Sequence, residues 1–203
     1  MGKGKFIVLE GCEGAGKSRQ SKLLTEALVE RGYDVVATRE PGGTALAEAL
    51  RALILDPNHS PDATAELYMY SAARRDHLNK VVFPALDDGK IVVCDRFTYS
   101  TLAYQGYGRG LDIDFVRRVN ESTISPLTVD LALFLDVNPV DGFKRKGGAD
   151  KADRLEREDL AFFERVYGGF KDMCGRGELT AIDASGTKQE TAEKILREVL
   201  RIL

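Results

Sequence analysis

The stretch at residues 11–18 constrains this chain most, because it fits the pattern G-x-x-x-x-G-K-[ST]. The segment 5–10 before it is short, apolar and partly β-branched, which predicts a buried strand. The segment 19–31 after it contains no proline or glycine and carries its leucines on one helical stripe. A strand, a glycine-rich loop and a helix form the context in which backbone N–H groups and a helix N-terminus hold phosphate.

Each residue of this loop is therefore a candidate ligand of a nucleoside triphosphate. In the pattern, Lys17 reaches the β- and γ-phosphates and Ser18 offers its hydroxyl to Mg²⁺. A glycine-rich turn that merely opens a helix is the structural alternative, and the correct flanks on both sides argue against it. The predicted phosphate-binding residues are Gly11, Cys12, Glu13, Gly14, Ala15, Gly16, Lys17 and Ser18.

Length and composition set the class of protein. A chain of 203 residues suits one domain, which we expect to span 1–203. The net charge of −3 argues against a broad nucleic-acid-binding face. No apolar run approaches the ~20 residues of a membrane helix, and the first strand begins too early for a signal peptide. Three scattered cysteines without C-x-x-C spacing favour reduced thiols. We expect a cytoplasmic protein without nucleic-acid or membrane partners.

Strand and helix signals alternate along the chain. Apolar, uninterrupted strands separated by helices predict a three-layer α/β fold, in which helices cover both faces of a five-stranded parallel sheet. The segment after the third strand is expected to be a polar, aromatic-rich loop, and Ser60 with Pro61 is expected to open a long helix. The strands are expected at 5–10, 34–38, 90–95, 131–136 and 179–183, and the helices at 19–31, 44–55, 60–86, from 112, from 138, up to 174, and at 188–203.

Charged residues stand where the predicted strands end, and ligands of such sheets bind at that edge. Asp95 could hold Mg²⁺ or its waters, while Arg96 could bridge two phosphate groups. A plain ion pair between them is the structural alternative. Glu10 and Arg39 end the first two strands and face the same edge.

The segment 144–157 is rich in cations and contains two adjacent glycines. A charged run alone is usually a solvated loop. Beside a phosphate site it predicts a short mobile lid that folds over the polyphosphate. Arg145 and Arg154 are the candidates for contact with the transferred phosphoryl group, because a guanidinium grips phosphate at two points. The guanine-reading signature Asn-Lys-x-Asp does not occur in the sequence, which disfavours a GTPase.

Four further segments carry a family resemblance. They are Arg-Glu-Pro-Gly-Gly-Thr at 39–44, Tyr-Ser-Ala-Ala-Arg at 70–74, Asp-Arg-Phe-Thr-Tyr-Ser-Thr at 95–101 and Ala-Tyr-Gln-Gly at 103–106. With these motifs in order, the chain resembles bacterial thymidylate kinases, nucleoside monophosphate kinases of the P-loop fold. The resemblance implies phosphorylation of dTMP to dTDP with Mg²⁺ and ATP, a step of dTTP synthesis, in a cytosolic homodimer.

The resemblance also implies individual roles. The phosphate-binding loop has no arginine at 12–15, where one branch of the family has one, so Arg145 or Arg154 is expected to supply that cation; which of the two does so stays open. The implied roles are ATP phosphates and metal for Lys17 and Ser18, acceptor phosphate and metal for Glu10, phosphates for Arg39 and Arg96, stacking on thymine for Tyr70, thymine O4 for Arg74, the N3 side of thymine for Thr101 and Gln105, and exclusion of a 2′-hydroxyl for Tyr104.

Three other functions stay open at this point. The chain could be a different P-loop nucleoside or nucleotide kinase, a GTP-hydrolysing switch, or a pseudo-kinase that only binds nucleotide.

Overall fold

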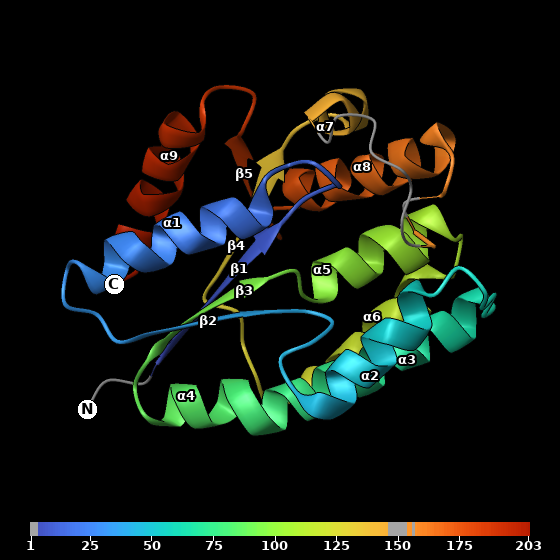
Figure 1. Cartoon of the computed structure of the whole chain (residues 1–203), viewed down its shortest axis with the longest axis horizontal. Helices are drawn as coiled ribbons and strands as arrows, with labels where there is room; N and C mark the ends of the chain where they lie inside the picture. The colour runs from blue at the N-terminus through green and yellow to red at the C-terminus, as the bar shows by residue number, and fades with distance from the viewer. Residues whose placement is uncertain (1–3, 146–153, 156) are drawn as a thin grey trace.

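The computed structural model describes residues 4–145, 154–155 and 157–203. Within them, five parallel strands form one sheet in the order β2-β3-β1-β4-β5. This result confirms the predicted parallel sheet, and Figure 1 shows the strands running between two layers of helices. The strands are β1 (Lys5–Glu10), β2 (Val35–Arg39), β3 (Ile91–Asp95), β4 (Leu131–Asp136) and β5 (Thr180–Asp183).

Several of the described helices begin at a residue whose side chain caps them. Thr44 accepts from the Ala47 N–H at the start of α2, and Thr187 and Glu190 form a reciprocal capping box at the start of α9. The helices are α1 (Lys17–Val29), α2 (Ala45–Leu55), α3 (Ala63–His77), α4 (Phe83–Asp87), α5 (Thr98–Thr101), α6 (Ile113–Ile124), α7 (Pro139–Arg145), α8 (Leu160–Gly175) and α9 (Lys188–Leu200), together with the π-helical segments η1 (Leu78–Val82) and η2 (Leu102–Gly108).

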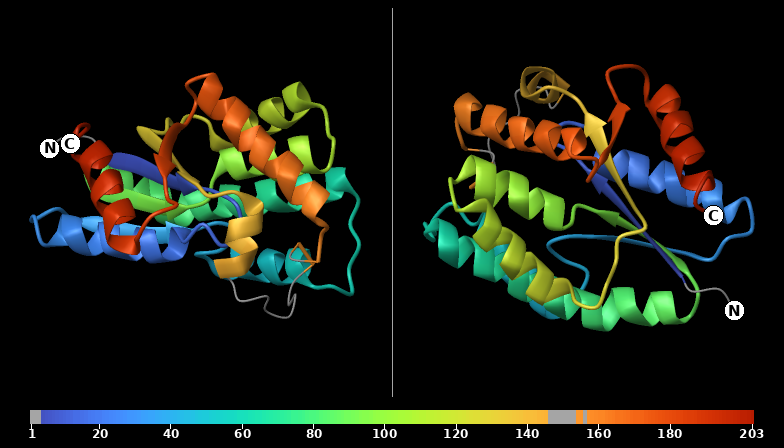
Figure 2. Two further views of the ribbon diagram at one scale, coloured as in Figure 1. Left: turned by 90° about the horizontal axis from the view of Figure 1, so that it is seen from above. Right: turned by 180° about the vertical axis from the view of Figure 1, so that it is seen from behind.

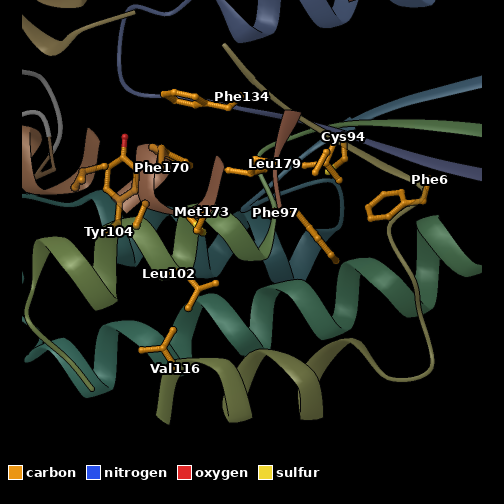
Figure 3. Packing of buried hydrophobic residues seen from close by; sticks show 14 of the residues in the cluster. Phe6, Cys94, Phe97, Leu102, Tyr104, Val116, Phe134, Phe170, Met173 and Leu179 are labelled. Carbon is orange, nitrogen blue, oxygen red and sulfur yellow. The ribbon is translucent and has the colours of Figure 1, made fainter. Parts of the chain in front are cut away.

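Alternate residues of β1 enter two separate cores. Ile7 and Leu9 pack with residues of α1 and α9 on one face of the sheet. Phe6 and Val8 point to the other face, where a larger cluster joins η2, α6 and α8 (Figure 3). Both faces of every central strand are thus removed from water, as the continuous apolar strands predict.

Two predicted elements are wrong. The long helix begins after Asp62 rather than at Ser60, because the Asp62 carboxylate accepts from the N–H groups of Thr64 and Ala65. The segment after β3 is helical rather than a loop, since α5 and η2 follow β3 directly. Tertiary packing stabilises this segment, because η2 lies against α8 with Gly108 close to Phe162.

All five strands end in a charged residue at the same edge of the sheet, and β1 leads directly into the phosphate-binding loop. Figure 2 shows both chain termini at the opposite end of the molecule. No helix among the described residues is long and apolar enough to cross a membrane. The fold therefore gathers the loop, the strand ends and η2 at one edge.

Candidate active site

The glycine-rich loop joins β1 to α1 with its lysine folded back on it. Gly14 and Gly16 have positive φ angles of 74° and 89°, which glycine adopts at no steric cost. The Nζ of Lys17 donates to the carbonyl oxygens of Gly11 and Cys12, each at 2.9 Å. Burial, and then the nearby Arg96 charge, lower the pKa of Lys17. The loop thus holds a desolvated cation next to backbone N–H groups.

Ser18 and Asp95 meet at the loop's edge. The Ser18 hydroxyl donates to Asp95 Oδ2 over 2.7 Å, from the first turn of α1 to the end of β3. A carboxylate and a hydroxyl are oxygen donors of the kind that Mg²⁺ takes together with substrate phosphates. The residues present therefore fit a Mg²⁺–nucleotide complex.

Arg96 has a strained backbone. It is the one non-glycine residue with a positive φ, 70°, in the described part of the chain. Its guanidinium donates to the Gly11 carbonyl at 3.1 Å and to the Tyr104 hydroxyl at 3.3 Å, and it forms an ion pair with Glu13. Such strain persists only where the surroundings hold it, and it is common at functional sites.

One cavity brings most of the predicted residues together. Its walls come from the loop, the ends of β2 and β3, the helices α2, α3 and α5, and η2, along with Leu155 beyond α7. The predicted residues that line it are Glu13, Lys17, Ser18, Arg39, Tyr70, Arg74, Asp95, Arg96, Thr101, Tyr104 and Gln105.

Arg74 is held rigidly in the cavity wall. Only 2% exposed, it donates from Nε to Glu40 at 2.7 Å, from Nη1 to Asn120 at 3.1 Å, and from Nη2 to Thr101 at 2.9 Å. Glu40 also bonds the His77 ring at 3.1 Å, and the Glu40–Pro41 peptide bond is cis. A buried guanidinium with this many partners has a fixed orientation toward any ligand.

Sequence reasoning missed Arg51, Glu40 and Asn120. Arg51 lies on α2 and lines the cavity beside Arg39, and both donate to the Pro41 carbonyl. Arg51 and Asn120 belong to none of the quoted motifs, and Glu40 lies within the 39–44 motif without a role of its own having been assigned to it. The helical repeat could have indicated Arg51. It lies seven residues, about two turns, after Thr44, the N-cap of α2, and therefore on the same side of the helix.

Glu10 lies behind the cavity wall rather than in it. Its carboxylate is fully buried and accepts from the N–H groups of Phe97 and Ser100 and from the Ser100 hydroxyl. Burial raises its pKa to about 7. The structure thus shows Glu10 bracing the turn between β3 and α5, and its role toward phosphate or metal stays a prediction.

The two candidate lid arginines lie in different places. Arg145 ends α7 and donates to the carbonyls of Ala184 and Ser185, at 2.9 and 3.0 Å. It borders a second cavity, which Gly14, Ala15 and Gly16 also line. Arg154 donates to the Ile54 carbonyl at 2.9 Å and pairs with Glu66 of α3. The rest of the predicted lid, residues 146–153 and 156, lies outside the described residues.

Comparison with known proteins agrees with this geometry. A thymidylate kinase family model matches residues 9–195. A thymidylate kinase of Synechococcus sp. (strain JA-3-3Ab) is 49% identical over 194 residues, covering 94% of this chain and 92% of that protein. Thymidylate kinases of Finegoldia magna and Halothermothrix orenii are 43% and 42% identical, covering 98% and 97% of this chain and 97% of each relative. The chain therefore belongs to the thymidylate kinase family.

Proposed function

We propose that this protein transfers the γ-phosphoryl group of ATP to dTMP and releases ADP and dTDP. The observation that carries the proposal is the single cavity in which Lys17 and Ser18 of the phosphate-binding loop face Arg74 and Gln105. A donor phosphate on the loop would therefore lie next to an acceptor whose base occupies the far wall. The relatives named above are thymidylate kinases, and this chain aligns with them over nearly their whole length.

The acceptor needs no protein base. A phosphate monoester has a second pKa of ~6 and is mostly dianionic at pH 7. Cys12 is no nucleophile here, since it is 1% exposed and burial raises the pKa of its thiol to about 12. The reaction is direct transfer between two phosphates that lie in line.

Repulsion between the two anions is the main obstacle, and fixed cations offset it. Lys17 serves the donor phosphates, while Arg39, Arg51 and Arg96 line the acceptor side of the cavity. Arg96 is held by the Gly11 carbonyl, Ser100 and Tyr104, so little rearrangement is needed when phosphate replaces Glu13 as its partner.

Ser18 and Asp95 would hold the Mg²⁺ that accompanies ATP. When bound, the ion supplies positive charge to the phosphate oxygens. The Ser18–Asp95 hydrogen bond keeps both oxygens at the mouth of the loop before nucleotide binds.

The second cavity suits the base of the donor nucleotide. It continues from Gly14–Gly16 to the β5–α9 loop, and the Arg145 side chain forms one wall. A guanidinium plane can stack on a purine. On this basis Arg145 orients ATP, and Arg154 is the better candidate for the acceptor side.

The test measures ADP release from Mg²⁺-ATP with dTMP, dUMP, CMP, AMP and GMP as acceptors. We expect turnover with dTMP, and weaker turnover with dUMP, because one methyl in an apolar pocket contributes only ~1–3 kcal/mol. Lys17→Ala should abolish transfer while the protein stays folded. Folded wild-type protein that releases no ADP with dTMP would refute the proposal, and a preference for another acceptor would point to a different nucleotide kinase.

We also propose that the protein is a cytoplasmic homodimer. The family resemblance suggests the dimer, and three exposed apolar side chains on α2 and α3 support it. Leu46 and Leu53 lie two turns apart on α2 and are 49% and 48% exposed, and Tyr68 on α3 is 52% exposed. Helices α2 and α3 pack side by side, so the three can form one apolar surface.

A further inference from the structure

Glu66 is a charged group at the centre of the protein that no motif indicates. It lies on α3 one turn before Tyr70 and is 0% exposed. A buried carboxylate is destabilising unless it is paired. Arg109 donates to both of its oxygens at 3.4 Å, and Arg154 forms an ion pair with Oε2. These two guanidinium groups offset the free-energy cost of burying the Glu66 charge.

The third partner of Glu66 is the amide of Gln105, at 2.6 Å. A carboxylate oxygen can only accept, so the amide must turn its NH₂ end toward Glu66. Gln105 lines the cavity, and no described residue donates to its Oε1. Nor is that oxygen one of the fully buried polar side-chain atoms that lack a partner in the described part of the chain, so a ligand can reach it. The free end of the amide is therefore a hydrogen-bond acceptor available to a ligand.

Arg74 offers the opposite polarity in the same wall. A guanidinium has five N–H donors, and Glu40, Asn120 and Thr101 take one each. The cavity thus presents spare donors at Arg74 and an acceptor at Gln105. Thymine and uracil match this pair with the O4 acceptor and the N3–H donor, whereas cytosine has the reverse polarity, an N4 amino donor and an N3 acceptor.

We propose that Glu66 is a positioning residue that makes the acceptor site select bases with an N3–H over cytosine, by holding the Gln105 amide in one orientation. This inference rests on the proposed function. The terminal amide torsion of glutamine is broad and nearly two-fold, so without the carboxylate the NH₂ end could turn to cytosine N3. Sites that bond a specific polar group reject mismatched substrates by as much as ~10⁴–10⁵-fold.

The test compares kcat/KM for dTMP, dUMP and dCMP in the wild type, Glu66→Gln and Glu158→Gln. Glutamine at 66 can donate to Gln105 Oε1 as well as accept, so both amide orientations become accessible. We expect Glu66→Gln to lower the dTMP:dCMP ratio at least ~10-fold. The dTMP:dUMP ratio should stay constant, because both bases carry N3–H.

Glu158→Gln is the matched control. It perturbs Arg109, which donates to Glu158 at 2.6 Å, and leaves the Glu66–Gln105 contact in place. We expect its dTMP:dCMP ratio to match the wild type. A folded Glu66→Gln enzyme with an unchanged dTMP:dCMP ratio would overturn the inference, whereas a wild type inactive with dTMP would refute the proposed function itself.

Nuclear magnetic resonance of the wild type decides the matter if Glu66→Gln does not fold. The side-chain amide signals of Gln105 are assigned by their loss in Gln105→Met. With dTMP bound, we expect these NH₂ protons to stay protected from exchange and to show contacts to the Glu66 side chain. Contacts from the NH₂ protons to the thymine ring instead would overturn the proposed orientation.

Discussion

At the scale of single residues, the site depends on charged side chains that are buried but fully paired. Glu40 and Arg74 hold each other in the cavity wall, and Glu66 holds Gln105. Glu10 and Lys17 differ, because the partners of Glu10 are neutral backbone and hydroxyl donors and those of Lys17 are backbone carbonyls. Hydrogen bonds from Ser100 and Phe97 only partly offset the effect of burial, and the pKa of Glu10 rises from 4.5 to about 7.

This raised pKa makes stability depend on pH. Between pH 4.5 and about 7 the folded chain keeps a proton on Glu10 that the unfolded chain has lost. The contribution of Glu10 is therefore fully present below pH 4.5 and is lost as the pH rises through 7, up to about 3 kcal/mol in all. Glu10→Gln, which keeps the shape of the side chain, should remove this part of the pH dependence. Urea unfolding at pH 5 and pH 8 measures the difference.

The exposed Glu121 on α6 provides the control. Glu121→Gln should leave the fall in unfolding free energy between pH 5 and pH 8 as it is in the wild type. An equal fall in Glu10→Gln and wild type would show that Glu10 is not the group responsible.

At the scale of elements, α7 touches the phosphate-binding loop through two glycines. A Cβ on Gly142 would lie 2.3 Å from the Glu13 carbonyl oxygen, and a Cβ on Gly14 would lie 2.1 Å from the Gly142 carbonyl oxygen. No side chain fits between these backbones. The contact sets the distance between the loop and Arg145 at the end of α7.

Gly142→Ala should push α7 away from the loop and weaken ATP binding. We expect the KM for ATP to rise about tenfold, since the loop and the Arg145 wall of the second cavity would separate. Gly168→Ala on α8 is the matched control, because nothing lies within 4 Å of a Cβ there. That variant should keep the wild-type KM and gain up to ~1 kcal/mol of stability. A Gly142→Ala enzyme with wild-type KM for ATP would show that the contact can relax.

The two lid arginines offer a second test at this scale. Arg145 borders the second cavity, where we propose that the donor base binds, and Arg154 pairs with Glu66, one turn before Tyr70 of the proposed acceptor site. Arg145→Ala should therefore mainly raise the KM for ATP. Arg154→Ala should lower kcat or raise the KM for dTMP, since a cation near transferring phosphate can contribute ~10³–10⁵ in rate. Steady-state kinetics with each substrate varied in turn separates the two outcomes, and the reverse assignment would contradict the placement.

At the scale of the whole molecule, the exposed apolar residues of α2 and α3 predict how the chain assembles. Light scattering should give a mass of two chains for the wild type. Leu53→Lys should shift the protein toward one chain, because a charge on this surface must be desolvated in the dimer. Val29→Lys, at a 54% exposed position on α1, should stay dimeric. A wild type with the mass of a single chain would disprove the dimer.

Local patterns in the sequence predicted much of this protein. The phosphate-binding loop, the five strands and the helix starts near 44, 112 and 188 follow from signals within a few residues of one another. The phosphate-loop pattern, the charged strand ends and the family motifs together led to eleven of the residues that line the cavity. Each of these features depends on local backbone chemistry or on a short spacing, which the sequence displays directly.

The remaining features depend on contacts between residues that are distant in the chain, and only the tertiary structure could reveal these contacts. Glu66 meets Gln105 across 39 positions and Arg154 across 88. Arg51 reaches the cavity because α2 packs against α3 and its Glu48 pairs with Arg39 at the end of β2. The helical state of 98–108 likewise follows from its packing against α8. The sequence by itself determined the fold class, the nucleotide-binding loop and the family. The tertiary structure decided which charges are buried together and which side chains line the cavity, because burial and pairing depend on segments that are distant in the chain.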